Sequence, residues 1–197
     1  MADSSLSSDA GLLVGSGSSA DAPSVADPWL SSAPVDWSIP KNLLWQLPEQ
    51  YSDSVQQSPF VLPLQAQADH IDHYGHVNNG VYLDWLQQVG WAHVEQMGLS
   101  LELYRRLDRA LVVHRHELDY LAPAYGDDQL VMATWVVQFN RVSVYRCFQL
   151  QRVGDGKTLF RAYSHYVCTR MSNGKACRLP PEFLDAYSCV EKTGPQY

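Results

Sequence analysis

From residue 60 onward, apolar positions recur with two different periods, which predict strands and one long helix. Alternation at Phe60, Leu62 and Leu64 predicts a strand over 60–67. Apolar side chains at positions 82, 85, 86, 89 and 92 have the spacing of one helix face and predict a helix over 80–97 that stops at Gly98. Segments rich in Val, Tyr, Thr and Phe then predict four more strands, at 110–121, 129–140, 143–153 and 158–171.

One helix followed by an antiparallel meander predicts an α+β fold in which the sheet wraps around the helix. Pro180 and Pro181 are expected to end the sheet. A sheet of this length around a single helix leaves an edge strand and a half-covered face, so self-association is expected.

Composition divides the chain into four parts. Residues 1–40, rich in Ser, Ala and Asp, cannot bury enough apolar surface to offset the entropy of ordering, and they are predicted to be a disordered tail. Residues 41–59 contain Trp45 among several leucines and are interpreted as an N-terminal arm or linker. Residues 60–190 form the predicted domain, and residues 191–197 a C-terminal tail. The first residues lack the basic segment and apolar run of a secretory signal, so export is not expected.

Composition also argues against several classes of protein. The chain has 197 residues, of which 46% are hydrophobic, and this predicts one domain with a true core. Its apolar runs are far shorter than the ~20 residues that span a bilayer. The net charge of −7 arises mostly before residue 60, because residues 60–197 hold 13 basic and 14 acidic residues, and no basic surface for nucleic acid is expected. The four cysteines show no C-x-x-C spacing, which favours a reducing cytoplasm over disulfides or a thiolate zinc site.

Candidate chemistry is concentrated between the first predicted strand and the helix. The segment 69–79 carries two acids, three histidines and two asparagines directly before the helix start. The first N–H groups of a helix lack intrahelical partners and carry partial positive charge, so they can stabilise a carbonyl oxygen that becomes an oxyanion. A carboxylate on the preceding loop would lie close to that electrophile.

This segment resembles the signature D-x-x-G-H-V-N-N-x-x-Y of hotdog-fold acyl thioesterases of the 4-hydroxybenzoyl-CoA thioesterase type, which are also similar to acyl-ACP thioesterases. The matching residues are Asp72, Gly75, His76, Val77, Asn78, Asn79 and Tyr82. The resemblance continues in His116–Pro123, in Gly126-Asp127 and in Arg141-Val142-Ser143, and it covers roughly residues 60–190.

The resemblance implies a hotdog fold, a homodimer or homotetramer with sites at subunit interfaces, and hydrolysis of an acyl-CoA or acyl-ACP thioester to acid and thiol. The family's loop aspartate, a nucleophile or general base, falls on Asp72. The backbone N–H groups near Asn79 and Gly80 are the oxyanion site expected from the family's loop-to-helix step, and His76 either orients the loop or touches the thioester. A thiol leaving group has a pKa near ~8.5 and departs without a strong acid, so one carboxylate and an oxyanion site suffice. No metal or other cofactor is implied.

Further substrate contacts are expected from Gly75, Tyr82, Trp85 and Arg141. Arg141, Lys175 and Arg178 could pair with the phosphates of CoA or phosphopantetheine, although scattered surface charges are the ordinary alternative. For Tyr82 and Trp85 the ordinary alternative is a place in the core at helical spacing.

Other interpretations of single residues stay open. Asp72 could be a structural acid that caps the helix, and Asn78 and Asn79 are expected to shape the turn and cap the helix. The three histidines at intervals of three could be read as a metal site, although a loop lacks the regular geometry that makes such spacing converge. His114 and His116 are expected on one face of their strand.

Two rival functions also remain. A dehydratase or hydratase of the same fold would need a paired histidine and acid for proton transfer at carbon. A non-catalytic acyl-binding protein would need no such groups. Many members of the family carry an acid and then an arginine inside the helix, where this chain has Gln87 and Gly90, so a general base on the helix is not expected.

Overall fold

The computed structural model describes residues 37–51 and 58–190. The predicted tails therefore lie outside the described residues, apart from residues 37–40 of the first tail. The helices and strands are β1 (Phe60–Gln65), α1 (Asn79–Gln96), α2 (Leu101–Arg106), β2 (Ala110–Tyr120), β3 (Gln129–Phe139), β4 (Ser143–Arg152), β5 (Thr158–Thr169) and α3 (Pro181–Val190), with 3-10 turns η1 (Glu49–Tyr51) and η2 (Ala68–His70).

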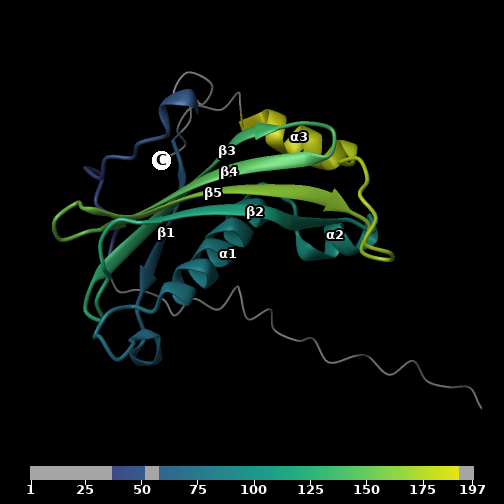
Figure 1. Cartoon of the computed structure of the whole chain (residues 1–197). Helices are drawn as coiled ribbons and strands as arrows, with labels where there is room; N and C mark the ends of the chain where they lie inside the picture. Colours follow the sequence, from purple (N-terminus) through teal and green to yellow (C-terminus); the bar gives the residue numbers. More distant parts are fainter. Residues whose placement is uncertain (1–36, 52–57, 191–197) are drawn as a thin grey trace, which may run out of the picture.

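The five strands form one antiparallel sheet in the order β1-β3-β4-β5-β2, and α1 lies across one of its faces (Figure 1). Each predicted strand is present, and its ends differ from the prediction by only one or two residues. The predicted class, an antiparallel sheet wrapped around one central helix, is confirmed.

The main core lies between α1 and the sheet. The helix contributes the face that its apolar spacing predicts, with Tyr82, Trp85, Leu86 and Val89 all buried. These side chains pack on inward-facing residues of the central strands, among them Leu130, Met132, Phe148, Leu150 and Phe160. The sheet therefore holds α1 along this one face, which fixes the position of the helix on the sheet.

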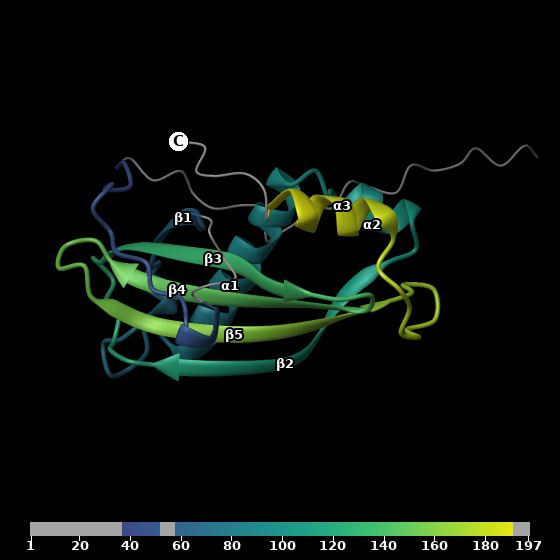
Figure 2. The same ribbon diagram turned by 90° about the horizontal axis from the view of Figure 1, so that it is seen from above.

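The opposite face of the sheet is covered by the segment that precedes β1. The Trp45 ring lies edge-on to Trp135 at 6.5 Å between centroids, and Tyr51 stacks on Tyr163 at 5.9 Å. Gln46 N–H donates to Gln149 Oε1 over 2.8 Å. Figure 2 shows this segment, in blue, crossing the sheet. Strand β3 is buried without interruption from residue 130 to 137 because it is covered on both faces.

Two helices that the sequence interpretation missed close one end of the sheet (Figure 1). The Tyr104 ring of α2 packs on Phe183 of α3 at 4.6 Å, within a second core cluster. Helix α3 opens on Pro181, and proline is favoured at the first position of a helix. The same proline was interpreted only as the end of the sheet.

Strand β2 is an edge of the sheet, because among the described residues it pairs with β5 alone. Val112, Val113 and Tyr120 expose 43%, 47% and 41% of their surface along it. The register shifts between Val113 and Arg115 through a β-bulge at His114. None of the described helices has the length and apolar character needed to cross a membrane.

The bulge makes the prediction for the two β2 histidines wrong. The His114 ring contacts His165 at 4.9 Å, whereas His116 Nδ1 lies 2.8 Å from Ser164 Oγ. Residues 164 and 165 are consecutive on β5 and point to opposite faces of the sheet. The extra residue of the bulge thus turns the two histidines to different faces.

Candidate active site

The loop between η2 and α1 is a tight hairpin. Ile71 and Val77 form an antiparallel bridge, Asp72 N–H donates to the His76 carbonyl over 2.8 Å, and Asn78 N–H donates to the His70 carbonyl over 2.9 Å. Gly75 N–H donates to the Asp72 carbonyl over 3.0 Å, closing a four-residue turn, and Gly75 has a φ of +80°. A positive φ of this kind is adopted by glycine at low cost, so the D-x-x-G part of the signature has a direct structural reason.

The Asp72 carboxylate is held by its own hairpin through one oxygen. Oδ1 accepts the N–H groups of Tyr74 and His76 at 2.9 and 3.2 Å. Oδ2 has no partner among the described residues, and the side chain is half-buried. The backbone therefore holds one carboxylate oxygen, and the other makes no hydrogen bond within the described residues.

The start of α1 leaves one backbone donor open. Asn78 caps the helix, as predicted, because its Oδ1 accepts Gly80 N–H over 2.9 Å. The Asn79 N–H has no hydrogen-bond partner among the described residues, and Asn79 is exposed. The sequence predicts two candidate donors, the N–H groups of Asn79 and Gly80. The Gly80 N–H already donates to Asn78, which leaves the Asn79 N–H as the open donor at the helix start.

The hairpin carries the Asp72 carboxylate and leads directly into the helix start that carries this donor. In its ladder, His70 lies opposite Asn78 and Asp72 opposite His76, so Asp72 and the helix cap Asn78 are diagonal neighbours on the two strands, about 7–8 Å apart in the backbone.

His76 rests on a second loop that is itself tightly held. Its ring lies edge-on to Tyr125 at 5.3 Å. Tyr125 N–H donates to Asp128 Oδ2 over 2.9 Å, and the Arg152 guanidinium lies over the Tyr125 ring at 5.7 Å. Arg152 Nε is also 2.9 Å from Asp128 Oδ2. The histidine thus packs on a connected aromatic and ionic group, and its backbone N–H holds Asp72.

Two aromatic residues of the signature region support the loop from the core. Tyr82 is 2% exposed, and its hydroxyl accepts Ala124 N–H over 3.1 Å. Val77 N–H donates to the Ala124 carbonyl over 2.9 Å, so the same residue joins the hairpin to the β2–β3 connection. Trp85 is 4% exposed and meets the His70 ring at 5.9 Å. Within one chain, Tyr82 and Trp85 lie beneath the hairpin and are not exposed beside it.

The three loop histidines point to different neighbours. His70 Nδ1 accepts Gln67 N–H over 3.0 Å, the His73 ring packs on Tyr74 at 4.4 Å, and His76 faces the β2–β3 connection. In residues 37–51 and 58–190, no three His, Cys, Asp or Glu side chains converge as metal ligands would. Each loop histidine thus contacts a different part of the structure.

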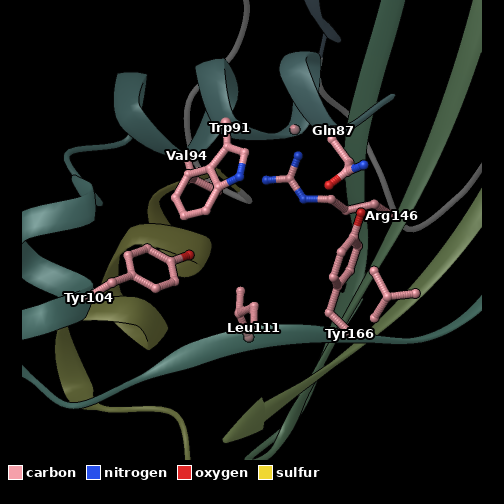
Figure 3. A pocket seen from close by; sticks show the side chains of 9 residues that line it. Gln87, Trp91, Val94, Tyr104, Leu111, Arg146 and Tyr166 are labelled. Atoms are coloured by element: carbon pink, nitrogen blue, oxygen red, sulfur yellow. The ribbon is translucent and has the colours of Figure 1, made fainter. Parts of the chain in front are cut away.

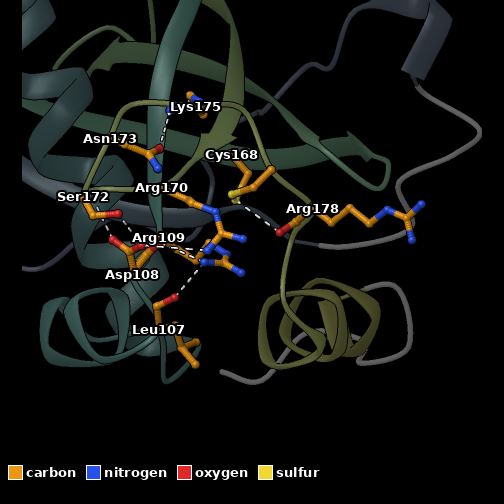
Figure 4. Close-up of polar contacts among 10 residues, drawn as sticks. Leu107, Asp108, Arg109, Cys168, Arg170, Ser172, Asn173, Lys175 and Arg178 are labelled. Carbon is orange, nitrogen blue, oxygen red and sulfur yellow. Dashed lines mark hydrogen bonds and ion pairs between the residues drawn. The ribbon is translucent and has the colours of Figure 1, made fainter.

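Arg141 lies at the other end of the sheet. The hairpin that carries Asp72 is hydrogen-bonded to the connection that precedes β3, whereas Arg141 follows the end of β3. The eleven residues of β3 therefore separate Arg141 from the hairpin by ~35 Å. The Arg141 carbonyl accepts Leu179 N–H over 2.8 Å. Lys175 and Arg178 are at this same end, together with Asp108 and Arg170, and the Arg178 side chain points away from that pair (Figure 4). Within one chain, these cations do not come near Asp72.

Asp108 organises this basic end. It adopts a φ of +52° and accepts both the N–H and the hydroxyl of Ser172 at 2.8 Å. These hydrogen bonds lower the pKa of the Asp108 carboxyl. Arg170 Nη1 lies 4.0 Å from the same carboxylate. The loop after β5 is therefore tied to the turn between α2 and β2.

The sequence interpretation missed a buried cation on β4. Arg146 is only 3% exposed and contacts His93 of α1, which is also buried. The available signal is the run Val144-Tyr145-Arg146-Cys147-Phe148, where a charge falls between apolar and aromatic residues. A charge at a core position is uncommon and indicates a special environment.

Comparison with known proteins places the chain among thioesterases. Residues 66–187 match the family described as the thioesterase-like superfamily. The long-chain acyl-CoA thioesterase FadM of Escherichia coli is 27% identical over 122 residues, which are 62% of this chain and 92% of FadM.

Solved structures share the fold. A 1,4-dihydroxy-2-naphthoyl-CoA thioesterase from Synechocystis superposes with a TM-score of 0.63 at 21% identity, covering 69% of this chain and all of that one. A Staphylococcus aureus protein described in complex with CoA superposes with a TM-score of 0.66 at 16% identity, covering 72% of this chain and 89% of its own. At these identities the likeness concerns the hotdog fold and not the substrate.

Proposed function

This chain belongs to the thioesterase-like superfamily, as its signature predicts, and we propose that it hydrolyses acyl-CoA thioesters at the Asp72 hairpin. The observation that carries the proposal is the pairing on one hairpin of a carboxylate with a free oxygen and an open helix N–H. The names of FadM and of the Synechocystis enzyme both specify acyl-CoA substrates, which favours CoA over ACP as the thiol carrier.

The geometry suggests how the reaction would proceed. The substrate carbonyl oxygen accepts Asn79 N–H at the positive end of α1, which stabilises negative charge on that oxygen as the carbonyl is attacked. Asp72 Oδ2 either attacks the carbonyl carbon or takes a proton from an attacking water. In the first route the CoA thiolate leaves and water then cleaves the acyl anhydride. In the second route the hydroxyl adds directly and the thiolate leaves. Loss of one oxyanion donor in acyl-transfer enzymes costs about 10²–10³ in rate.

A homodimer formed through β2 would complete this site. The outer edge of this strand pairs with no described strand and carries exposed apolar side chains, which a second copy can cover. Antiparallel pairing of β2 with its own copy lays the Ala110 end of one strand beside the Tyr120 end of the other. Because the Tyr120 hydroxyl donates to the Asn79 carbonyl over 3.1 Å, this pairing brings the basic end of the second copy toward the start of α1.

In such a dimer, Arg141 would serve the Asp72 site of the other subunit, because the ~35 Å between the two within one chain is too far for a direct contact. The CoA phosphates would then be bound by cations of that other subunit. Sedimentation of the full chain tests the assembly. Charge introduced on the edge, as in Val113→Lys, should convert dimer to monomer, whereas Lys157→Glu in the β4–β5 turn should leave the dimer intact.

Thiol release tests the reaction itself. Short-chain, long-chain and aromatic acyl-CoA esters are incubated with the full chain and a thiol-trapping reagent, beside acyl-ACP counterparts and an enoyl-CoA. We expect thiol from at least one saturated or aromatic acyl-CoA, at a higher kcat/KM than from its ACP counterpart. No thiol from any ester, with loss of the enoyl absorbance, would indicate a dehydratase or hydratase. Binding without turnover would indicate an acyl-binding protein.

A further inference from the structure

A cavity of about 120 Å³ lies between the second half of α1, α2 and the inner face of β2, β4 and β5. Its walls are mainly apolar and aromatic, with Trp91, Tyr104, Leu111 and Tyr166 among them. Gln87 is the lining residue nearest the start of α1, eight residues past Asn79, which places the cavity ~12 Å along the helix from the proposed oxyanion donor. The cavity is therefore separate from the Asp72 hairpin.

Arg146 lines this cavity with a guanidinium that lacks a counter-charge. Nη1 lies 3.2 Å from His93 Nδ1 and 3.5 Å from Thr134 Oγ1. Nη2 is buried and has no hydrogen-bond partner, and no carboxylate pairs with this arginine in the described part of the chain. Figure 3 shows the guanidinium pointing into the space between Trp91 and Tyr166.

The neighbours of Arg146 supply no negative charge. Burial, followed by the charge of Arg146, lowers the pKa of His93 to about 2, so this histidine is neutral and accepts a hydrogen bond from the arginine. Burial raises the pKa of Tyr104 and of Tyr166, so both phenols stay protonated. An unpaired buried charge costs several kcal/mol of stability in proteins. An anionic ligand would remove that penalty and would satisfy Nη2.

We propose that this cavity binds a compact apolar carboxylate of about the size of benzoate, with the carboxylate on Arg146 and the apolar body between Trp91, Tyr104 and Leu111. Arginine matches a carboxylate through parallel N–H groups, and such charge-assisted hydrogen bonds are the strong ones. The volume limits the apolar body to one ring at most, since a cavity of ~150 Å³ holds one benzene molecule and this one has about 120 Å³. Long acyl chains exceed this volume, and inorganic anions leave the apolar walls unfilled.

Calorimetry and thermal unfolding of the full chain with benzoate test the proposal. Benzoate should bind saturably and raise the unfolding midpoint, because a ligand of the native state stabilises it. Benzamide keeps the ring but loses the charge, and formate keeps the charge but loses the ring. Both should bind at least about tenfold more weakly, as expected from one lost charge-assisted hydrogen bond or the lost apolar contact.

Two variants separate the arginine from general charge effects. Arg146→Met should weaken benzoate binding at least about tenfold. Arg106 is an exposed arginine on α2, and Arg106→Met should bind benzoate as the unmodified chain does. If Arg146→Met does not fold, the comparison of benzoate with benzamide and formate still decides. Equal affinity for benzoate and benzamide, the absence of saturable binding, or unchanged benzoate binding by a folded Arg146→Met would overturn the proposal. The readouts are binding and unfolding, so failure here is distinguishable from failure of the hydrolysis proposal.

Discussion

Replacing Asp72 by Asn separates the two roles that the hairpin gives to this carboxylate. Asn has the same shape and keeps an oxygen that can accept the N–H groups of Tyr74 and His76, which Oδ1 accepts at 2.9 and 3.2 Å. It lacks the negative charge needed for attack or for proton abstraction. Asp72→Ala removes both the hairpin acceptor and the charge.

The expected magnitudes follow from these contacts. Each of the two hydrogen bonds contributes about 0.5–1.5 kcal/mol, so Asp72→Ala should lower the free energy of unfolding by about 1–3 kcal/mol. Asp72→Asn should lower it by less than about 1 kcal/mol, because both bonds can persist. The rate should nevertheless fall by about 10²–10⁴ in both variants, since that is the usual contribution of a positioned acid or base.

The assay combines thiol release with urea denaturation of the same preparations. Asp69→Asn is the matched control, because Asp69 is an exposed acid three residues away with no hydrogen bond in the described chain. Its rate and stability should be unchanged. An Asp72→Asn variant with the unmodified kcat/KM would refute the chemical role, and an Asp72→Ala variant of unchanged stability would refute the structural one.

Three further predictions concern stability, each measured by urea denaturation. Gly90→Ala should raise the free energy of unfolding by up to about 1 kcal/mol, because a helical alanine is favoured and its Cβ would meet only a ring atom at 3.9 Å. Trp45→Ala should lower the free energy of unfolding by about 1–2 kcal/mol through lost packing on Trp135. An unchanged free energy of unfolding would show that the packing of Trp45 on the sheet does not stabilise the fold. Burial and then the charge of Arg146 lower the pKa of His93 to about 2 in the folded chain. Below pH ~6.5, His93 therefore becomes protonated in the unfolded chain but not in the folded chain. Stability should then fall by up to ~1.4 kcal/mol per pH unit as pH decreases, and His93→Gln should remove that part of the slope.

The strands and α1 could be predicted because tertiary packing reinforces their local patterns. The face of α1 that carries Tyr82, Trp85 and Val89 is the face that the core buries. The short helix α2 and the helix α3 gave weaker signals. Six residues are too few for a clear helical period in α2, and in α3 a proline that opens a helix was interpreted as a proline that ends a sheet.

The sequence pointed to the segment of the candidate site but not to the hydrogen bonds within it. The signature pointed to Asp72 and to the start of α1, yet only coordinates show that Gly80 N–H is occupied by Asn78 and that Asn79 N–H is open. The β2 bulge also required coordinates, since one extra residue places His114 and His116 on opposite faces of the sheet. The sequence shows Arg146 only as a charge between apolar neighbours, and its lack of a carboxylate partner became visible only in the structure.

The arrangement of thioester, carboxylate and helix start can be observed directly in a crystal structure of the full chain with a ketone analogue of an acyl-CoA, in which methylene replaces sulfur. We predict that the ketone oxygen accepts Asn79 N–H and that the carbonyl carbon faces Asp72 Oδ2. An analogue bound with its carbonyl away from the start of α1, or beside a different carboxylate, would contradict the assignment of hydrolysis to this hairpin.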